Sequence, residues 1–123
     1  MALQKMTITE EDLLRSKIVT PGWYKAVVKD INQEQAADGQ SLNTIVDIIV
    51  TEDGEFKGVP LKRYFSEKAP GFSVTFFEAC GAKIAAGSSY AWEPCKGKTL
   101  QVYVINGEYR GRKTNVAEDF RPV

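Results

Sequence analysis

The chain has 123 residues, 43% of them hydrophobic, and its 16 Lys and Arg residues balance its 16 Asp and Glu residues to a net charge of zero. This length suits one domain with a single modest core, so two independent domains are not expected. Histidine is absent. Its absence removes the most common general base and the most frequent transition-metal ligand, which argues against an enzyme, a metal site or a cofactor site.

The sequence also bears on where the protein works. No apolar run approaches the roughly 20 residues of a membrane-spanning helix, and the N-terminal residues lack the apolar block of a secretion signal. Cys80 and Cys95 suit a reducing compartment, although the sequence leaves their pairing open. We therefore expect a soluble cytoplasmic protein with no membrane partner.

Residues 1–21 predict an N-terminal arm that carries a short helix. Thr9 can cap the segment from Glu10 to Arg15, whose first turn is acidic as the helix dipole favours. Pro21 and the glycine after it end this arm. Residues 22–123 are then expected to form the single domain.

The first two strands follow. GWYKAVVKDI, residues 22–31, is rich in aromatic and β-branched residues, and we expect Tyr24, Ala26 and Val28 inside, leaving Trp23 and Lys25 outward. NQEQAADGQ, residues 32–40, predicts a loop or hairpin tip. SLNTIVDIIVTE alternates with two partly apolar faces, which predicts a central strand.

FKGVPLKRYFSE, residues 56–67, predicts a third strand after a turn at EDGE. Its alternation buries Leu61 and Phe65 and leaves Lys62 and Tyr64 outward.

A helix is predicted next, because apolar residues recur every four positions behind a proline suited to a first helical turn: Pro70, Phe72, Phe76, Cys80 and Ile84. Gly81 is expected to end it. In the loop that follows, Trp92 is expected to anchor the chain to the core.

KTLQVYVI and EYRGRKTNVAEDF predict the last two strands, joined by a tight turn at Asn106 and Gly107. A two-residue turn there pairs Tyr103 with Arg110 and Gln101 with Arg112 on the outward face. The opposite, core-facing side carries Leu100, Val102, Val104 and Tyr109. A bulge at Gly111 would exchange the faces beyond it, so Lys113 and Asn115 are also candidates.

Three strands, one helix and two strands is the order of the OB-fold, a mostly β architecture built on a five-stranded antiparallel Greek-key barrel. We expect that fold, with the helix between the third and fourth strands. Other small barrels and sandwiches share much of this pattern.

The zero net charge conceals an uneven distribution along the chain. Residues 22–56 hold two bases and seven acids, residues 57–68 hold four bases and one acid, and residues 96–115 hold five bases and one acid. If the basic segments meet in space, they create a local field that attracts a polyanion.

Cations interleaved with exposed aromatic rings suit single-stranded nucleic acid, because cations track phosphates while rings stack on unpaired bases. The candidate binding residues are Trp23, Lys25, Lys62, Tyr64, Gln101, Tyr103, Arg110, Arg112, Lys113 and Asn115. The simpler reading of the same residues is a solubilising barrel surface.

Two other functions stay open. Net neutrality and the acidic second hairpin are compatible with a protein-interaction or virion-assembly module that also associates with itself. A metal-dependent nuclease would use Asp30, Asp47 or Glu52, but these carboxylates form no convergent motif.

Several stretches resemble the small single-stranded-DNA-binding proteins that bacteriophages encode for replication and recombination. The likeness spans most of residues 20–121 and rests on PGWYKAVV, FKGVPLKRYF, FFEACG and GKTLQVYVINGEYRGRKTNVAEDFRP. It implies an OB-fold, sequence-tolerant binding of single strands, partnership with replication or recombination proteins, and a location in the cytoplasm of an infected bacterium. The positions that match are Tyr64, Tyr103, Arg110, Arg112, Lys113 and Asn115. In place of the flexible acidic tail of many such proteins stands AEDFRPV, so recruitment of partners by a tail is not expected.

Overall fold

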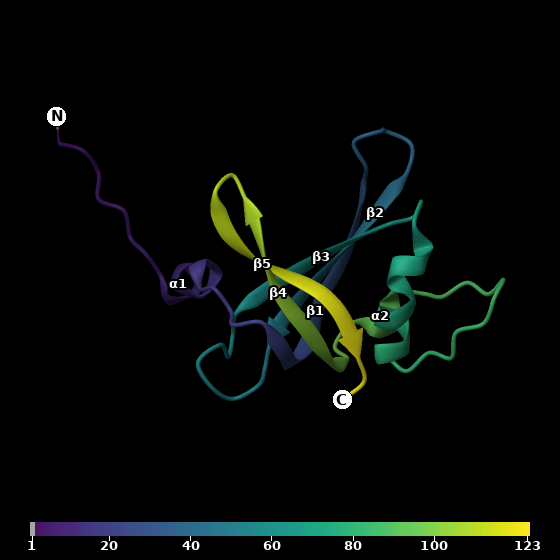
Figure 1. Cartoon of the computed structure of the whole chain (residues 1–123). Coiled ribbons are helices and arrows are strands. Elements are labelled where there is room, and N and C mark those ends of the chain that lie inside the picture. The colour runs from purple at the N-terminus through teal and green to yellow at the C-terminus, as the bar shows by residue number, and fades with distance from the viewer. Residues whose placement is uncertain (1) are drawn as a thin grey trace.

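The computed structural model describes residues 2–123, and most of its regular secondary structure is β-strand (Figure 1). In chain order its elements are α1 (Glu10–Ser16), β1 (Gly22–Gln35), β2 (Leu42–Val50), β3 (Pro60–Ser66), the 3-10 helix η1 (Pro70–Ser73), α2 (Val74–Ala79), the 3-10 helix η2 (Glu93–Cys95), β4 (Thr99–Tyr109) and β5 (Arg112–Arg121). No helix among these residues is long and apolar enough to cross a bilayer.

The strands form one antiparallel sheet in the order β3-β2-β1-β4-β5. The long central strand β1 pairs with β4 along its first half and with β2 along its second half. A bulge between Val28 and Asp30 separates two parts of the β1–β2 pairing, and bulges commonly bend a strand. The central strand predicted in SLNTIVDIIVTE is confirmed, since β2 lies between β3 and β1.

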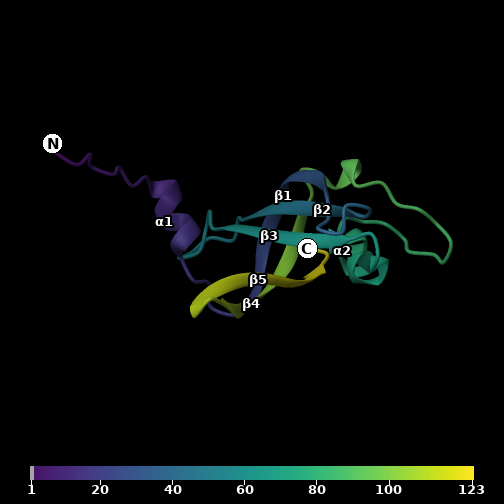
Figure 2. The ribbon, with the colours of Figure 1, turned by 90° about the horizontal axis from the view of Figure 1, so that it is seen from above.

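The two ends of this strand order lie side by side, so the sheet curls on itself (Figure 2). A side chain connects them: Arg63 of β3 donates from Nη1 to the carbonyl oxygens of Ala117 and Glu118 in β5, at 2.8 and 3.3 Å. The guanidinium also lies over the Phe65 ring, 5.0 Å from its centroid.

The core lies inside the curled sheet, and the alternation predicted for β1 to β3 is confirmed. Ala26 and Val28 are fully buried, and Leu61 and Phe65 nearly so. Phe76 of α2 is fully buried, with its ring centroid 5.5 Å from that of Phe65. Trp92 anchors its loop as expected, because its ring lies 4.5 Å from that of Phe77.

The predicted helix after Pro70 is shorter and less regular than its apolar spacing suggested. A 3-10 turn precedes the single α-helical stretch of α2, and the chain leaves the helix before Gly81, whose φ is +100°. Phe72 is consequently 69% exposed, and Ile84 falls in the following loop. The predicted end at Gly81 is confirmed, because Gly81 follows the C-cap Cys80 with a positive φ. The four-residue spacing was wrong for Phe72, which is exposed, and for Ile84, which lies beyond the helix.

The N-terminal segment carries the expected cap. Thr9 and Asp12 form a capping box, in which the Asp12 amide donates to Thr9 Oγ1 and the Thr9 amide donates to Asp12 Oδ2. Farther along, Val19 is fully buried. The expected arm of residues 1–21 thus ends in a residue of the core.

Candidate nucleic-acid interface

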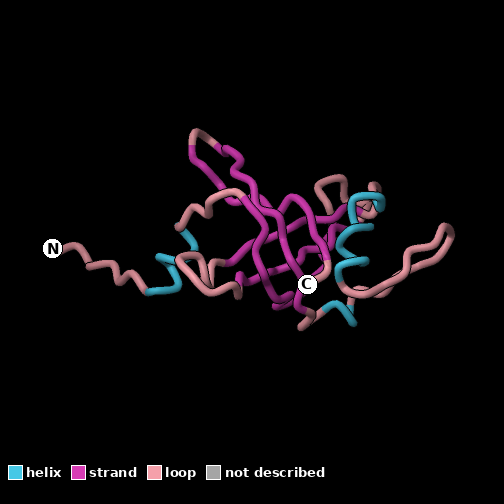
Figure 3. Tube along the Cα trace, turned by 60° about the horizontal axis from the view of Figure 1, so that its bottom comes forward, coloured by secondary structure: helices cyan, strands magenta, loops and turns pink. Residues whose placement is uncertain are grey.

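The β4–β5 hairpin extends beyond the curled sheet as an arm (Figure 3). Its turn is formed by Arg110 and Gly111, at φ values of +51° and +77°, and Tyr109 pairs with Arg112 across it. Two consecutive residues with positive φ are what a two-residue type I′ turn requires. The predicted turn at Asn106 and Gly107 is therefore wrong.

Asn106 and Gly107 serve packing inside the arm instead of turning it. A Cβ atom on Gly107 would lie 2.9 Å from Val116 Cγ2 and 3.2 Å from Thr114 Oγ1, closer than side chains tolerate. Asn106 donates from Nδ2 to the carbonyl oxygen of Val19 at 2.9 Å. Both residues therefore belong within a strand, where glycine marks a close approach.

Moving the turn changes the pairing of the outward residues. Tyr103 lies opposite Asp119, and Gln101 lies opposite Arg121. The predicted pairs of these two residues with Arg110 and Arg112 are wrong. Because β4 continues without a turn, Tyr109 shares the outward face with Tyr103, so its predicted place on the core side is also wrong.

The tip of the arm gathers one aromatic ring and three cations. Tyr109 is 64% exposed, and Arg110 Cζ lies 5.3 Å from its ring centroid. Arg110, Arg112 and Lys113 are all exposed, and within residues 2–123 none of them forms an ion pair. This tip is therefore a small positive patch with an accessible ring.

A second group lies on the outer face where β1, β4 and β5 run side by side. Trp23 faces Tyr103 across the strands, and their ring centroids are 5.2 Å apart. Arg121 Cζ lies 4.1 Å from the Trp23 ring centroid, and its Nε donates to Gln101 Oε1. Lys25 is exposed beside this group.

The two groups occupy one continuous face, which we call the β4–β5 face: Trp23, Lys25, Gln101, Tyr103, Tyr109, Arg110, Arg112 and Arg121. Tyr109 lies six positions after Tyr103 along β4, a strand length of roughly 20 Å. Aromatic rings and cations thus stand at both ends of an extended ribbon.

Lys62 and Tyr64 point outward from β3, as predicted, but they form a separate patch. Tyr64 is 53% exposed. Lys62 Nζ lies 3.7 Å from Asp47 Oδ1, on the neighbouring strand β2. Arg63, which lies between these two residues in β3, bonds to β5. The Lys62–Tyr64 patch therefore lies on β3, the strand beside β5 and the β4–β5 face.

Asn115 points to the inner side of the arm and binds the N-terminal segment. Its Oδ1 accepts the amide of Val19 at 2.8 Å, and its Nδ2 donates to the carbonyl oxygen of Lys17 at 2.8 Å. Lys113 lies opposite Glu108 on the same side of the arm. Asn115 is therefore occupied with the chain itself.

The basic segment 57–68 is largely neutralised in space. Its lysines pair with acids of residues 22–56: Lys57 with Asp53, Lys62 with Asp47, and Lys68 with Asp38. The local positive field that the sequence suggested for this segment is therefore reduced by its own neighbours. In the second basic segment, residues 96–115, the cations without an ion pair within residues 2–123 are Lys98 and the three at the tip of the β4–β5 hairpin, Arg110, Arg112 and Lys113.

The carboxylates considered for a nuclease are each engaged. Asp30 and Asp47 face each other across β1 and β2, and each lies near a lysine. The pKa of Asp30 is lowered because its carboxylate accepts the Ile31 amide, with Lys96 contributing. Within residues 2–123 no three acidic or cysteine side chains gather closely enough to hold a metal ion.

Two residues of the β4–β5 face were not on the predicted list. The predicted turn at Asn106 and Gly107 puts Tyr109 on the core side, and the predicted list does not include Arg121. The Arg110-Gly111 pair was the available signal for Tyr109, since glycine suits the second position of a type I′ turn. Arg121 reaches Trp23 only through the register of three strands, which no local pattern encodes.

Comparison with known proteins adds no relative. No protein-family model matches the chain, and no curated protein matches its sequence.

Proposed function

We propose that this chain binds single-stranded DNA without sequence preference, through the β4–β5 face, and that its fold is an OB-fold. The observation that carries the proposal is the tip of the arm, where exposed Tyr109 stands among three cations that lack ion-pair partners within residues 2–123. Rings that stack on bases beside cations that follow phosphates are the general means of binding single strands.

The strand order supports the OB-fold part of the proposal. In the structure β1 pairs with both β2 and β4, α2 follows β3, and β5 lies beside β3. A five-stranded Greek-key barrel requires these neighbours. The resemblance of the sequence to phage single-stranded-DNA-binding proteins extends the proposal to replication or recombination partners.

Within the proposed interface the residues have distinct roles. Tyr109 stacks on a base at the tip, and Trp23 with Tyr103 offers a second stacking position. Arg110, Arg112 and Lys113 contact phosphates beside Tyr109 at the tip. Tyr64 on β3 is a further exposed ring, which single-stranded DNA can reach where it leaves the β4–β5 face. Asn115 is left out because its carboxamide is already bound.

The test is a titration of a fluorescently labelled oligo(dT), followed by anisotropy at several salt concentrations. Replacing Arg110, Arg112 and Lys113 together by Gln should weaken binding and reduce the slope of log affinity against log salt by about 2, because each phosphate contact on a single strand contributes about 0.7. Gln keeps a side chain at Arg110, so the strain of its positive φ is unchanged.

A matched control removes the same charge elsewhere. Lys29, Lys83 and Lys98 are exposed and also lack ion pairs within residues 2–123. Replacing these three by Gln should leave the slope nearly unchanged. Equal losses in both variants, or no binding of the unmodified chain at low salt, would refute the proposed interface.

A protein-interaction or virion-assembly module is the second candidate. It is favoured by the exposed apolar side chains of the N-terminal arm, among them Leu3 and Met6. Light scattering with and without oligo(dT) separates the two functions. An assembly that ignores DNA supports the second one.

A further inference from the structure

The N-terminal segment, residues 2–8, carries apolar side chains that no other part of the described residues 2–123 covers. Leu3 is 95% exposed and Met6 is 88% exposed. Residues 2–8 contain one base, Lys5, and no acid. Residues 2–8 are therefore an exposed segment without regular secondary structure that is apolar and weakly cationic.

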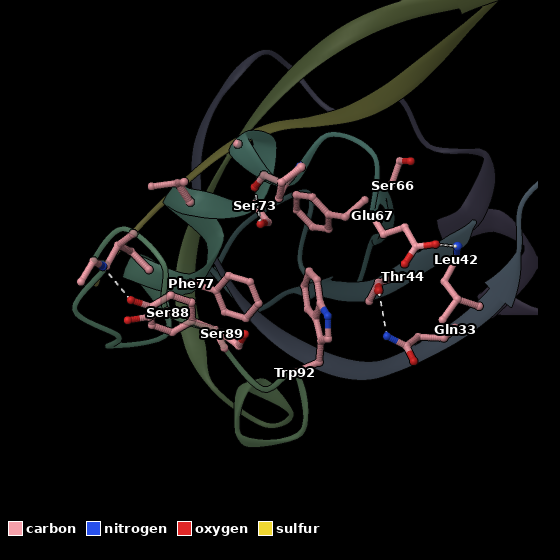
Figure 4. Close-up of a pocket in the computed structure, with 17 residues that line it drawn as sticks. Gln33, Leu42, Thr44, Ser66, Glu67, Ser73, Phe77, Ser88, Ser89 and Trp92 are labelled. Atoms are coloured by element: carbon pink, nitrogen blue, oxygen red, sulfur yellow. Dashed lines mark hydrogen bonds between the residues drawn. The ribbon is translucent and has the colours of Figure 1, made fainter. Parts of the chain in front are cut away.

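A cavity of about 510 Å³ opens near the other end of the molecule, between α2, the loop that follows it and the edge of β2 (Figure 4). Its walls include four aromatic rings, Phe65, Phe77, Tyr90 and Trp92. The rings are held by one another: the centroid of Phe77 lies 5.6 Å from that of Tyr90 and 4.5 Å from that of Trp92. This is the size and lining of a pocket that binds a compact apolar group.

The loop that borders the cavity is held in place. The Tyr90 hydroxyl accepts the Ala85 amide at 2.7 Å and donates to the Lys83 carbonyl oxygen at 2.9 Å. These two bonds close the loop on itself, so the cavity does not depend on a loose segment for its shape.

The rim of the cavity carries negative charge. Within residues 2–123, Glu67 is the one charged residue that lines it. Its Oε1 accepts the Leu42 amide at 2.7 Å, which fixes the carboxylate at the edge of the cavity (Figure 4). A phosphate group is repelled there, whereas an apolar segment that carries an ammonium group is complementary.

Residues 2–8 of the same molecule cannot fill this cavity. α1 and the N-terminal segment before it extend from one end of the sheet. In both views α2 and the loop that follows it lie at the opposite end (Figures 1 and 2). The seven residues 2–8 span at most about 25 Å when extended, and a domain of this size is about 35 Å across. Leu14 of α1 also packs over Gly58, and this contact holds α1 at the end of the molecule away from the cavity.

We propose that residues 2–8 of one copy bind the cavity of a second copy. Leu3 and Met6 are three residues apart, one turn of a polyproline II segment, so both can enter the aromatic cavity from one side. Lys5 then reaches Glu67 at the rim. Because donor and acceptor surfaces lie at opposite ends, the contact is heterologous, and copies add head to tail in an open row. This inference does not rest on DNA binding.

Sedimentation velocity over a range of protein concentrations, without DNA, tests the proposal. The unmodified chain should grow in average mass as concentration rises. Leu3→Ser with Met6→Ser should weaken association about a hundredfold, because burial of two large apolar side chains is lost. Leu13→Ser with Ile18→Ser is the matched control: it removes two exposed apolar side chains outside residues 2–8 and should associate normally.

A second variant blocks the cavity. Gly71 lines it, has no positive φ, and has open space where a Cβ would stand, so Gly71→Phe should fill the cavity without strain. Alone, this variant and the Leu3→Ser/Met6→Ser variant should each stay monomeric. In a mixture, the Gly71→Phe variant contributes intact residues 2–8 and the Leu3→Ser/Met6→Ser variant contributes an intact cavity. The two should therefore form a heterodimer that grows no further.

Three results would overturn the proposal: an unmodified chain that stays monomeric at the highest concentration reached, variants that associate like the unmodified chain, or a mixture that stays monomeric. A Gly71→Phe variant that loses oligo(dT) binding but still self-associates would assign the cavity to nucleobases instead. Circular dichroism of each variant shows whether the fold is retained.

Discussion

Two asparagines decide how the N-terminal segment meets the rest of the molecule. Asn106 and Asn115 lie opposite each other on the inner side of the arm, and together they bind the backbone of Lys17 and Val19 through three hydrogen bonds. Val19 is fully buried, so its amide and carbonyl groups need partners that water cannot supply. The carboxamide side chain provides a donor and an acceptor at once.

Asn115→Ala should therefore lower stability and leave DNA affinity unchanged. The variant leaves the Val19 amide unpaired, at a cost of about 1–3 kcal/mol in the free energy of unfolding. Urea unfolding measures the loss, and oligo(dT) anisotropy measures affinity. Asn32→Ala, at an exposed position, is the control and should change stability by no more than about 0.5 kcal/mol. Reduced affinity in a fully folded Asn115→Ala protein would place this residue in the interface after all.

The tips of the two long hairpins are built differently, although both project from the sheet (Figure 1). The β4–β5 tip is basic and closes with Arg110 and Gly111. The β1–β2 tip closes around Asp38, whose carboxylate pairs with Lys68 and accepts the amides of Gln40 and Ser41. The Lys68 ammonium, followed by these amides, holds the pKa of Asp38 well below its ordinary value of 3.8.

The lowered pKa predicts how the β1–β2 tip responds to acid. A carboxyl group whose pKa falls on folding stabilises the native state above its ordinary pKa, and this contribution is lost as the pH falls below about 4. Stability measured from pH 6 down to pH 2 should therefore fall less steeply in Asp38→Asn than in the unmodified chain. Glu34→Gln changes an exposed carboxylate on the same hairpin that forms no ion pair within residues 2–123, and this variant should keep the original slope. Identical slopes in all three proteins would contradict the assignment.

At the scale of the whole molecule, one side chain joins the ends of the sheet. Arg63 bonds two carbonyl oxygens of β5 and covers Phe65, so the seam between β3 and β5 depends on a side chain as well as on core packing. Edges of a sheet that are not closed by main-chain pairing expose free backbone groups. The arginine satisfies two of them.

Arg63→Met should open this seam while keeping the apolar length of the side chain. We expect a loss of about 1–3 kcal/mol in the free energy of unfolding, because the carbonyl groups lose a charged donor. Hydrogen exchange should accelerate in β3 and β5 and stay unchanged in the β1–β4 pairing. Arg63→Lys, which restores one donor, should recover part of the protection. Uniform exchange across all five strands would show that the arginine does not hold the seam.

Local patterns in the sequence determined the number of strands, the central place of residues 42–50, the faces of β1 to β3, and the cap at Thr9. Each of these depends on neighbours in the chain: alternation along a strand, or a side chain that bonds an amide three residues ahead. The outward positions of Trp23, Lys62, Tyr64 and Tyr103 followed from the same alternation.

Register and charge pairing were decided by the tertiary structure alone. Asn106-Gly107 is the strongest turn signal in the sequence, yet Asn106 bonds Val19 from a segment 87 residues away, and β4 runs on to a turn at Arg110. The placement of Arg121 on Trp23 and the pairing of the 57–68 lysines with acids likewise join residues distant in sequence. Such contacts form only when the sheet curls, because the free energy of packing all five strands outweighs the preference of any two residues for a turn.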